Sequence, residues 1–500
     1  MNKKHFIFLT IIISLFACKK ESHQALNINP FADEPPRNTF LADSPWPITH
    51  CNNYAQASSP FPGPSNNNCT TDFKTSTPGI ITIVISSPYP NGTRVLWTGN
   101  GTHIVKAVDT GRGFSIIALK QKENVSLTSI LNIKNYFSGA YTFIDKDNIF
   151  YNPSGTKINA YGDQIAGDPF SGIELLRSFT IPANLISSDE QIVGMTMTYD
   201  GHVVFATNNG LVGLTDRNFS MLKIISFPDE EISNSIACDE EQGIYVVTSK
   251  KMYRVQWTGT ELTIDENKGG WSAEYENGIG TSGIRLGAGS GSTPTLMGIG
   301  NNDKFVVITD GQPLMHLVLL WRDQIPSNWQ QIPNTKSRRI AAQIPIRFGN
   351  PSATKTLSEQ SVCVRGYGAM VVNNELKNST DNKVANILLS GNPGNAPYGL
   401  EKFEWNPTQR KLRSVWANTS VSFPSGIPCM SAATNLAYCM GQNNGVWNFS
   451  AINWSTGQTV FEYPLGNNLQ YNSAYAATEI GLNKGLYSGT LLGVTGVWQK

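Results

Sequence analysis

Two glutamates and an arginine in a glycine-rich stretch are the first side chains that could do chemistry. Glu274 and Glu276 flank Tyr275, so in an extended segment both carboxylates lie on the same side of the chain. Such a pair can bind a cation or serve as acid and base. Arg285 follows in the same stretch, and loops on a rigid scaffold carry function more often than strands do. The simpler alternative is a solvated loop without a site.

A second group of candidates lies in an unusually apolar run of the sequence: Asp310, His316, Trp321, Arg322 and Asp323. Asp310 precedes a glycine, which is the simplest signal of a turn. A histidine in an apolar strand is usually a hydrogen-bonded core residue, so a functional role for His316 is the less frequent alternative. Arg322 and Asp323 are expected either to pair at a strand end or to line one mouth of a channel together with Trp321.

The sequence contains no catalytic motif that would identify an active site. Residues 278–283 match Gly-x-Gly-x-x-Gly, but no helical pattern follows them, so a nucleotide site is not expected. The sequence contains no Gly-x-Ser-x-Gly elbow and no His-Glu-x-x-His pair. Catalytic residues and metal ligands therefore stay unassigned.

The N-terminus carries an export signal. Residues 1–5 are basic, and residues 6–17 form an apolar core that is too short to span a bilayer as a helix. The core ends in Leu15-Phe16-Ala17-Cys18, which resembles the lipobox of bacterial lipoproteins. This resemblance implies that Cys18 is lipidated, becomes the first residue of the mature chain and anchors it in a membrane. The alternative is an ordinary signal peptide with an unrelated cysteine.

Six cysteines remain after the lipobox, and an even number in an oxidising compartment favours disulfides. They are Cys51, Cys69, Cys238, Cys363, Cys429 and Cys439. We expect the pairs that are closest in sequence, Cys51 with Cys69 and Cys429 with Cys439. The other two would pair with each other or stay buried.

The composition argues against a nucleic-acid partner and for many short strands. The chain has 38 basic and 37 acidic residues, a formal net charge of +1, and only 15% charged residues. Such a chain has no basic field that would attract a polyanion. Its 45 glycines and 27 prolines suit many strands joined by many turns.

Residues 192–228 are the clearest repeat unit and read as four short strands rich in Val, Ile, Thr, Met and Phe. Asp200-Gly201 and Asn209-Gly210 separate strands, and both dipeptides suit tight hairpin turns. Four antiparallel strands in about 37 residues make one blade of a β-propeller. Similar units recur along the chain, and residues 386–392 are taken as a strand of the sixth. We expect an all-β fold, a single β-propeller with four-stranded antiparallel blades, and favour eight blades over seven.

The other segments are assigned around this repeat. Residues 19–45 are polar and without periodicity, so they are expected to form a flexible tether to a propeller domain over residues 46–500. A strand from residues 46–87 is expected to complete the last, partial blade, because closure removes exposed edges. Residues 66–78 and 268–291 are expected to be loops. No long segment has a helical period, so helix content should be low.

One repeat carries a resemblance to a known family. Ala451 to Phe461 (AINWSTGQTVF) resembles the propeller repeat of quinoprotein-like proteins, Ala-Leu-Asp-x-x-Thr-Gly-x-x-x-Trp. The Asx and Thr-Gly positions form the turn between outer strands, and the large aromatic residue docks between blades. Trp46-Pro47 is also similar to the opening of many such proteins. The resemblance implies a propeller of roughly eight blades.

The same resemblance bears on cofactors. Enzymes of that family use an adjacent pair of cysteines beside pyrroloquinoline quinone (PQQ), and no two cysteines are adjacent here, so PQQ is not supported. Calcium stays a candidate without assigned ligands. The family also includes the lipid-anchored propeller of the outer-membrane β-barrel assembly machinery, a scaffold without catalysis, which is the nearer analogy for an anchored propeller.

Anchor and propeller together predict an exported lipoprotein of the bacterial cell envelope, held in the outer membrane and facing the periplasm or the cell surface. Its expected role is a binding or scaffolding module with envelope proteins as partners. The alternative is an enzyme at the channel mouth, either a metal-dependent lactonase or hydrolase or a quinoprotein-type dehydrogenase. Such an enzyme would gather carboxylates at one mouth, whereas a scaffold would show an apolar or aromatic patch on outer loops.

Overall fold

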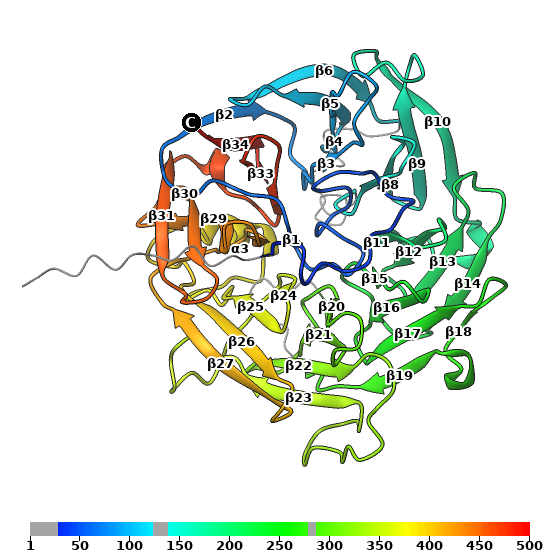
Figure 1. The fold of residues 1–500 in the computed structure, drawn as a ribbon, viewed down its shortest axis with the longest axis vertical. Helices are drawn as coiled ribbons and strands as arrows, with labels where there is room; N and C mark the ends of the chain where they lie inside the picture. The colour runs from blue at the N-terminus through cyan, green and yellow to red at the C-terminus, as the bar shows by residue number, and fades with distance from the viewer. Residues whose placement is uncertain (1–28, 124–138, 279–286) are drawn as a thin grey trace, which may run out of the picture.

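Eight β-sheets stand around a central channel as the blades of a propeller (Figure 1). The computed structural model describes residues 29–123, 139–278 and 287–500. Within these residues, seven blades run in sequence order from the innermost to the outermost strand, and the eighth combines both ends of the chain. The expected all-β propeller with eight four-stranded blades is confirmed, and the seven-bladed alternative is wrong.

The strands of each blade are given from the channel outward. Blade 1 holds β3 (Val84–Ile85), β4 (Leu96–Gly99), β5 (His103–Asp109) and β6 (Phe114–Gln121); blade 2 holds β7 (Phe143–Ile144), β8 (Phe150–Ser154), β9 (Lys157–Asp163) and β10 (Ile173–Thr180). Blade 3 holds β11 (Ile192–Met197), β12 (Val203–Thr207), β13 (Leu211–Thr215) and β14 (Lys223–Ser226); blade 4 holds β15 (Ala237–Cys238), β16 (Gly243–Val247), β17 (Lys251–Trp257), β18 (Leu262–Thr263) and β19 (Trp271–Glu274).

The second half of the ring follows the same order. Blade 5 holds β20 (Thr295–Met297), β21 (Phe305–Thr309), β22 (His316–Trp321) and β23 (Ile340–Pro345); blade 6 holds β24 (Cys363–Arg365), β25 (Gly368–Val372), β26 (Leu400–Asn406) and β27 (Lys411–Asn418). Blade 7 holds β28 (Cys429–Ser431), β29 (Leu436–Asn443), β30 (Val446–Asn453) and β31 (Thr459–Gly466), with β1 (Ser58–Ser59) parallel to β28; blade 8 holds β32 (Thr478–Ile480), β33 (Gly485–Thr490), β34 (Gly493–Gln499) and β2 (Cys69–Thr75). Short 3-10 turns cover Ala183–Leu185, Glu266–Lys268 and Leu469–Tyr471.

Blade 3 shows why these sequences form sheets. Strands β12 and β13 are buried on both faces because neighbouring blades cover them, whereas the outermost strand β14 is largely exposed. Buried Val, Phe and Leu side chains therefore follow one another without a polar face. The predicted hairpin turns are present: Gly201 and Gly210 adopt φ angles of 90° and 84°, which glycine reaches without strain.

Blade 8 is closed by both ends of the chain. Strand β2 pairs antiparallel with β34, from Cys69 opposite Gln499 to Thr75 opposite Gly493. This confirms that a strand from residues 46–87 completes the last blade. The loop expected at residues 66–78 is wrong, because an outermost strand with mostly polar, half-exposed side chains lacks the apolar alternation that marks a buried strand.

Two further expectations about single segments are wrong. Strand β19 lies within the stretch expected to be a loop and pairs with β17 beyond the short β18. The strand expected at residues 386–392 is replaced by helix α3 (Lys383–Leu389), because the Asn382 side chain caps the helix by accepting from the Ala385 amide at 3.0 Å. No other α-helix occurs among the described residues, in line with the expected low helix content, and none found there is long and apolar enough to cross a membrane.

Residues 46–59, called here the channel segment, run inside the ring of innermost strands, where Figure 1 shows the blue chain crossing the centre. Their carbonyl groups accept hydrogen bonds from backbone amides of innermost strands in six blades, at 2.8–3.0 Å. The pairs are Trp46 with Ile85, Pro47 with Ile144, Asn53 with Cys238, Tyr54 with Leu296, Gln56 with Val364, and Ala57 with Met430. The innermost strand of each of these blades is a sheet edge. The channel segment accepts hydrogen bonds from backbone amides of these edges, which would otherwise be buried without a partner.

The channel segment closes the end of the channel where the innermost strands end, called the closed mouth. The opposite end, where these strands begin, is called the open mouth, with reference to the described residues alone. Residues 29–45, the last part of the expected tether, lie over the closed mouth. Asn38 donates to the Thr198 carbonyl at 3.0 Å, and Leu41 forms an isolated bridge with Asp145.

The cysteines of the described residues are buried free thiols, so the expected disulfides Cys51–Cys69 and Cys429–Cys439 are wrong. Cys429 lies opposite Tyr438 in the β28–β29 ladder, so the side chain of the next residue, Cys439, points to the other face of the sheet. The two thiols pack in different apolar clusters, toward blade 8 and toward blade 6. Cys18 lies outside the described residues.

Candidate ligand site at the open mouth

A pocket of about 390 Å³ lies at the open mouth. Its wall consists of residues that precede the innermost strands and of turns between second and third strands. Thr82 comes from blade 1, Tyr141 from blade 2, Asn208 from blade 3, Glu359 from blade 6 and Tyr475 from blade 8. Residues from distant parts of the chain meet here because all blades converge on the axis. The volume lies within the range of small-molecule sites, about 300–1,000 Å³.

The channel segment forms the floor of this pocket. Thr49 belongs to the lining, and the imidazole of the next residue, His50, lies 5.9 Å from the Tyr141 ring between centroids. On its other side, His50 Nε2 is 3.3 Å from the Ser361 hydroxyl. Burial lowers the pKa of His50 to about 4, so the imidazole is neutral at physiological pH. Because the channel segment fills the channel below, a ligand would enter and leave by the open mouth.

Acidification is expected to destabilise the protein through His50. Its folded-state pKa of about 4 lies below the ordinary value, so the stability that the neutral imidazole contributes is fully present above pH ~6.5 and is lost as the pH falls toward 4. A shift of this size corresponds to about 3 kcal/mol at pH 4. Urea denaturation between pH 7 and 4 measures the loss. His50→Gln, which cannot be protonated, should lose less stability than the wild type, and equal losses would contradict the assignment.

Carboxylates outnumber amines in the described lining. Asp189, Glu231 and Glu359 contribute carboxylates, and Lys383 contributes the amine. The exposed Glu231 carboxylate favours a neutral or cationic ligand over a polyanion. Within the described part of the chain, no three His, Cys, Asp or Glu side chains gather in a way that could hold a metal ion.

The residues do not fit PQQ, the cofactor of the quinoprotein dehydrogenases. PQQ is a polycarboxylate, and the exposed Glu231 carboxylate of the described lining would repel it. The chain also lacks the adjacent pair of cysteines that accompanies the cofactor in those enzymes.

The acidic pair predicted from the sequence lies apart from the described lining. Glu274 ends β19 and is exposed, with its carboxylate 3.8 Å from Lys251 Nζ. The Glu276 carboxylate lies 3.7 Å from Lys336 Nζ. The two carboxylates thus face different lysines. Arg285 lies outside the described residues.

Asp310 and His316 lie side by side at the turn between β21 and β22. The buried Asp310 carboxylate accepts from the His316 amide at 2.8 Å, and its other oxygen lies 2.7 Å from His316 Nδ1. The pair holds the turn together, which is the simpler interpretation of Asp310-Gly311 in the sequence. Neither side chain belongs to the described lining of the pocket.

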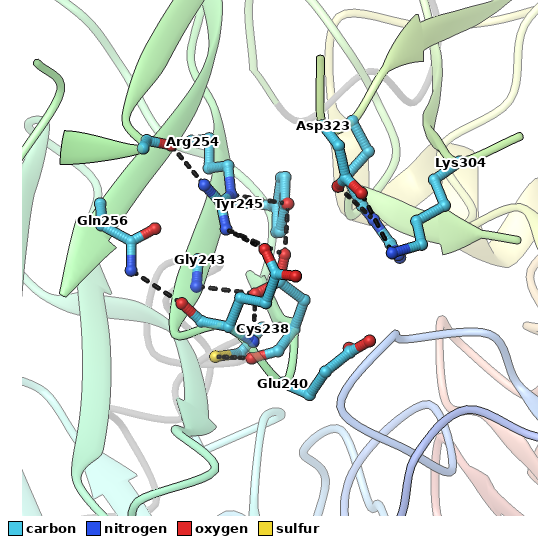
Figure 2. A network of polar contacts seen from close by, with 12 residues as sticks. Cys238, Glu240, Gly243, Tyr245, Arg254, Gln256, Lys304 and Asp323 are labelled. Carbon is cyan, nitrogen blue, oxygen red and sulfur yellow. Dashed lines mark hydrogen bonds and ion pairs between the residues drawn. The ribbon is translucent and has the colours of Figure 1, made fainter. Parts of the chain in front are cut away.

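Trp321, Arg322 and Asp323 lie at the closed-mouth end of β22. The Trp321 ring packs in the apolar cluster between blades 5 and 6. Arg322 is buried, and its guanidinium lies 4.8 Å from the centroid of the Tyr54 ring in the channel segment. Asp323 forms a 3.0 Å ion pair with Lys304 (Figure 2). Arg322 therefore holds the channel segment against blade 5, away from the pocket.

A polar network of blade 4 lies beside this contact (Figure 2). Arg254 Nε donates to the Tyr245 hydroxyl at 2.9 Å, and that hydroxyl donates to Asp239 at 2.6 Å. Burial raises the pKa of Tyr245 well above its usual value, which keeps the phenol neutral and able to donate. The Tyr54 hydroxyl donates to Glu240, the residue after Asp239, at 2.5 Å.

Sequence reasoning missed the residues that line the pocket. Thr82, Tyr141, Glu231, Glu359 and Tyr475 lie in irregular stretches before short innermost strands, scattered along most of the chain. No local motif joins them. They share one position in the repeat, shortly before the innermost strand of each blade. An alignment of the eight repeat units with one another would therefore place them in neighbouring columns and could have identified them.

Solved structures that superpose on this chain share the propeller fold. A quinohemoprotein alcohol dehydrogenase from Comamonas testosteroni gives a TM-score of 0.56 over 91% of this chain and 81% of that chain, at 13% identity. The quinohemoprotein alcohol dehydrogenase ADHIIG from Pseudomonas putida HK5 gives 0.54 over 91% and 80%, at 11% identity. At these identities the likeness shows the fold alone.

A much closer likeness exists at the level of sequence, although no family model matches the chain. An uncharacterised protein of Archaeoglobus fulgidus is 44% identical over 483 residues, which cover 94% of this chain and 90% of that protein. The alignment thus covers nearly the whole of both chains. The chain therefore belongs to the same family as this Archaeoglobus fulgidus protein.

Proposed function

We propose that this protein is an exported, lipid-anchored binding module of the cell envelope that takes a small polar ligand into the open mouth of its channel. The observation that carries the proposal is a blind pocket of about 390 Å³ above the channel segment. A pocket closed below can bury most of a ligand's surface, whereas a through-channel would leave the ligand open at both ends.

The chemistry of the wall supports a neutral or cationic polar ligand. The Asn208 and Asn234 amides, the Thr82 hydroxyl and the exposed Glu231 carboxylate are set among apolar side chains such as Ile427. A mainly apolar wall with a few polar groups is usual for small-molecule sites, and the polar groups fix the orientation of the ligand. Sugars and organic amines have the complementary hydroxyl and ammonium groups.

Thermal unfolding of the Cys18→Ala protein with monosaccharides, polyamines, calcium and PQQ tests the site. A ligand bound only by the folded state stabilises it by about 2.7 kcal/mol at a hundredfold excess over Kd. We expect a sugar or a polyamine to raise the unfolding temperature in a saturable way. Ser233→Trp, in the lining, should abolish the shift, and Ser327→Trp, on the exposed connection between β22 and β23, should keep it.

The panel can contradict the proposal in three ways. A shift that survives Ser233→Trp would place the binding site elsewhere on the protein. A shift with PQQ alone would contradict the argument from the acidic lining. If no probe shifts the unfolding temperature, the scaffold role is favoured, and the search turns to envelope proteins.

Replacement of Cys18 by alanine is expected to release the protein from membranes, because the lipid attached there would supply the anchor. Fractionation of cells into membrane and soluble material measures the release. Cys69→Ala is the matched control, since this thiol lies in the folded domain and its loss should leave the protein on the membrane. Continued membrane association of Cys18→Ala would refute the lipoprotein assignment.

A further inference from the structure

The described chain begins at the closed mouth. Arg365, which ends β24, donates through Nη2 to the Pro30 carbonyl at 2.5 Å and through Nη1 to the Glu34 carboxylate. The Arg365 side chain is buried, so these contacts hold the first described residues against blade 6. Asn29 accepts from the Phe31 amide at 3.1 Å, which fixes its place in the same turn.

The length of chain before this point limits how far the closed mouth can lie from an anchor at Cys18. Cys18 precedes Asn29 by eleven residues. A fully extended chain spans at most about 3.6 Å per residue, which gives an upper limit of about 40 Å. A lipid on Cys18 therefore keeps the closed mouth near the bilayer, while the open mouth lies at the other end of the channel.

Two exposed aromatic rings lie at the closed mouth. Phe31 is 57% exposed and Phe61 is 39% exposed, and their rings meet edge to face with centroids 6.3 Å apart. Phe31 follows Pro30, and the Phe61 carbonyl accepts from Ser431, the last residue of β28, at 2.7 Å. Exposed Phe side chains are favoured at the boundary of lipid headgroups and acyl chains.

We propose that the closed mouth is the surface that lies against the lipid bilayer, with Phe31 and Phe61 in contact with the headgroup region, and that the open mouth faces away from it. This inference rests on the lipid anchor proposed above. It also specifies the source of the ligand: the pocket takes its ligand from the aqueous compartment, and the bilayer lies on the far side of the channel segment.

Fluorescence quenching on vesicles tests the orientation with the lipidated full chain. Cysteines of the described residues are buried, so an introduced exposed cysteine can be labelled selectively. Lys146→Cys places a fluorophore in the exposed β7–β8 turn at the closed mouth, and Asn209→Cys places one in the exposed β12–β13 turn at the open mouth. In phosphatidylcholine vesicles with a quencher on the lipid headgroup, the label at position 146 should be quenched several-fold more. Equal or stronger quenching at position 209 would overturn the proposal.

Two controls keep this result separate from the anchor itself. Cys18→Ala in both labelled proteins should remove them from the vesicles, and labelled protein that stays bound without Cys18 would refute the anchor. If the anchor holds but position 209 is the more quenched, the orientation alone is refuted. Phe31→Ser with Phe61→Ser should reduce quenching at position 146, and unchanged quenching would refute the aromatic contact with lipid.

Discussion

Replacement of Lys106 by alanine is expected to lower the free energy of unfolding by about 3–5 kcal/mol. Lys106 Nζ lies between blades 1 and 2, 2.6 Å from the Asp163 carboxylate, and both side chains are almost fully buried. The same amine donates to the Ser171 carbonyl at 3.1 Å. Without it, the Asp163 charge stays in a site closed to water and has no counter-charge. Urea denaturation followed by tryptophan fluorescence measures the loss.

A double variant is the matched control for this ion pair. Lys106→Met with Asp163→Asn removes both charges but keeps an acceptor for the Tyr89 hydroxyl, which donates to Asp163 at 2.8 Å. Because neither charge then needs to be desolvated, the double variant should be more stable than Lys106→Ala. A loss below about 1 kcal/mol in Lys106→Ala would contradict the buried character of the pair.

Replacement of Trp46 by alanine is expected to lower the free energy of unfolding by about 3–5 kcal/mol as well. Trp46 has no exposed surface and packs with residues of blades 1, 7 and 8, among them Leu96 and Leu486. Its loss would leave a cavity at the point where the channel segment enters the ring. Equilibrium denaturation measures the loss of unfolding free energy. A large loss is expected if the channel segment is part of the hydrophobic core, and a small one if it only occupies the channel.

Two other tryptophan variants calibrate this result. Trp46→Phe keeps most of the apolar volume and should lose less stability than the alanine variant. Trp329→Ala removes the same side chain from a half-buried site on the connection between β22 and β23 and should cost less. If Trp46→Ala and Trp329→Ala lose equal amounts, the channel segment does not belong to the core.

The repeated architecture could be predicted because its signals are local. Each blade is made of short strands of buried residues and of tight turns, and the turns at Gly201 and Gly210 need a backbone conformation that glycine favours. Strand β2 was not predicted, because this outermost strand lacks the buried apolar face that marks a strand in a sequence. Helix α3 was not predicted, because seven residues are too few to show the 3.6-residue periodicity of an amphipathic helix.

The channel segment could not be predicted because its conformation depends on distant partners. His50, Cys51, Ala55 and Ala57 adopt φ angles of 66°, 78°, 55° and 51°, in the left-handed region that such residues rarely enter. No local preference favours this backbone. The hydrogen bonds to six blades hold it in place, and a sequence does not show which blades will surround a segment.

The predicted disulfides were wrong for a similar reason: the positions of the cysteines depend on strand register, which their spacing in sequence does not show. Cys429 and Cys439 are near in sequence, but the register of β28 against β29 sends their side chains to opposite faces of blade 7. Each behaves as a small apolar residue in a different cluster. The pocket residues could not be predicted from the sequence either, because Thr82 and Tyr475 meet at the same mouth only once the ring has closed.

The channel segment also sets the order in which the protein can fold as it is made. It is among the first parts of the chain to be synthesised, yet Gln56 pairs with Val364, and Ala57 pairs with Met430. Strand β2 waits longer still, because its partner β34 ends at Gln499. Pairings over such separations form slowly, since loop closure must precede them. The channel segment therefore gains its partners one blade after another, whereas β2 stays without its partner until β34 is made, and the pairing of β2 with β34 closes the ring.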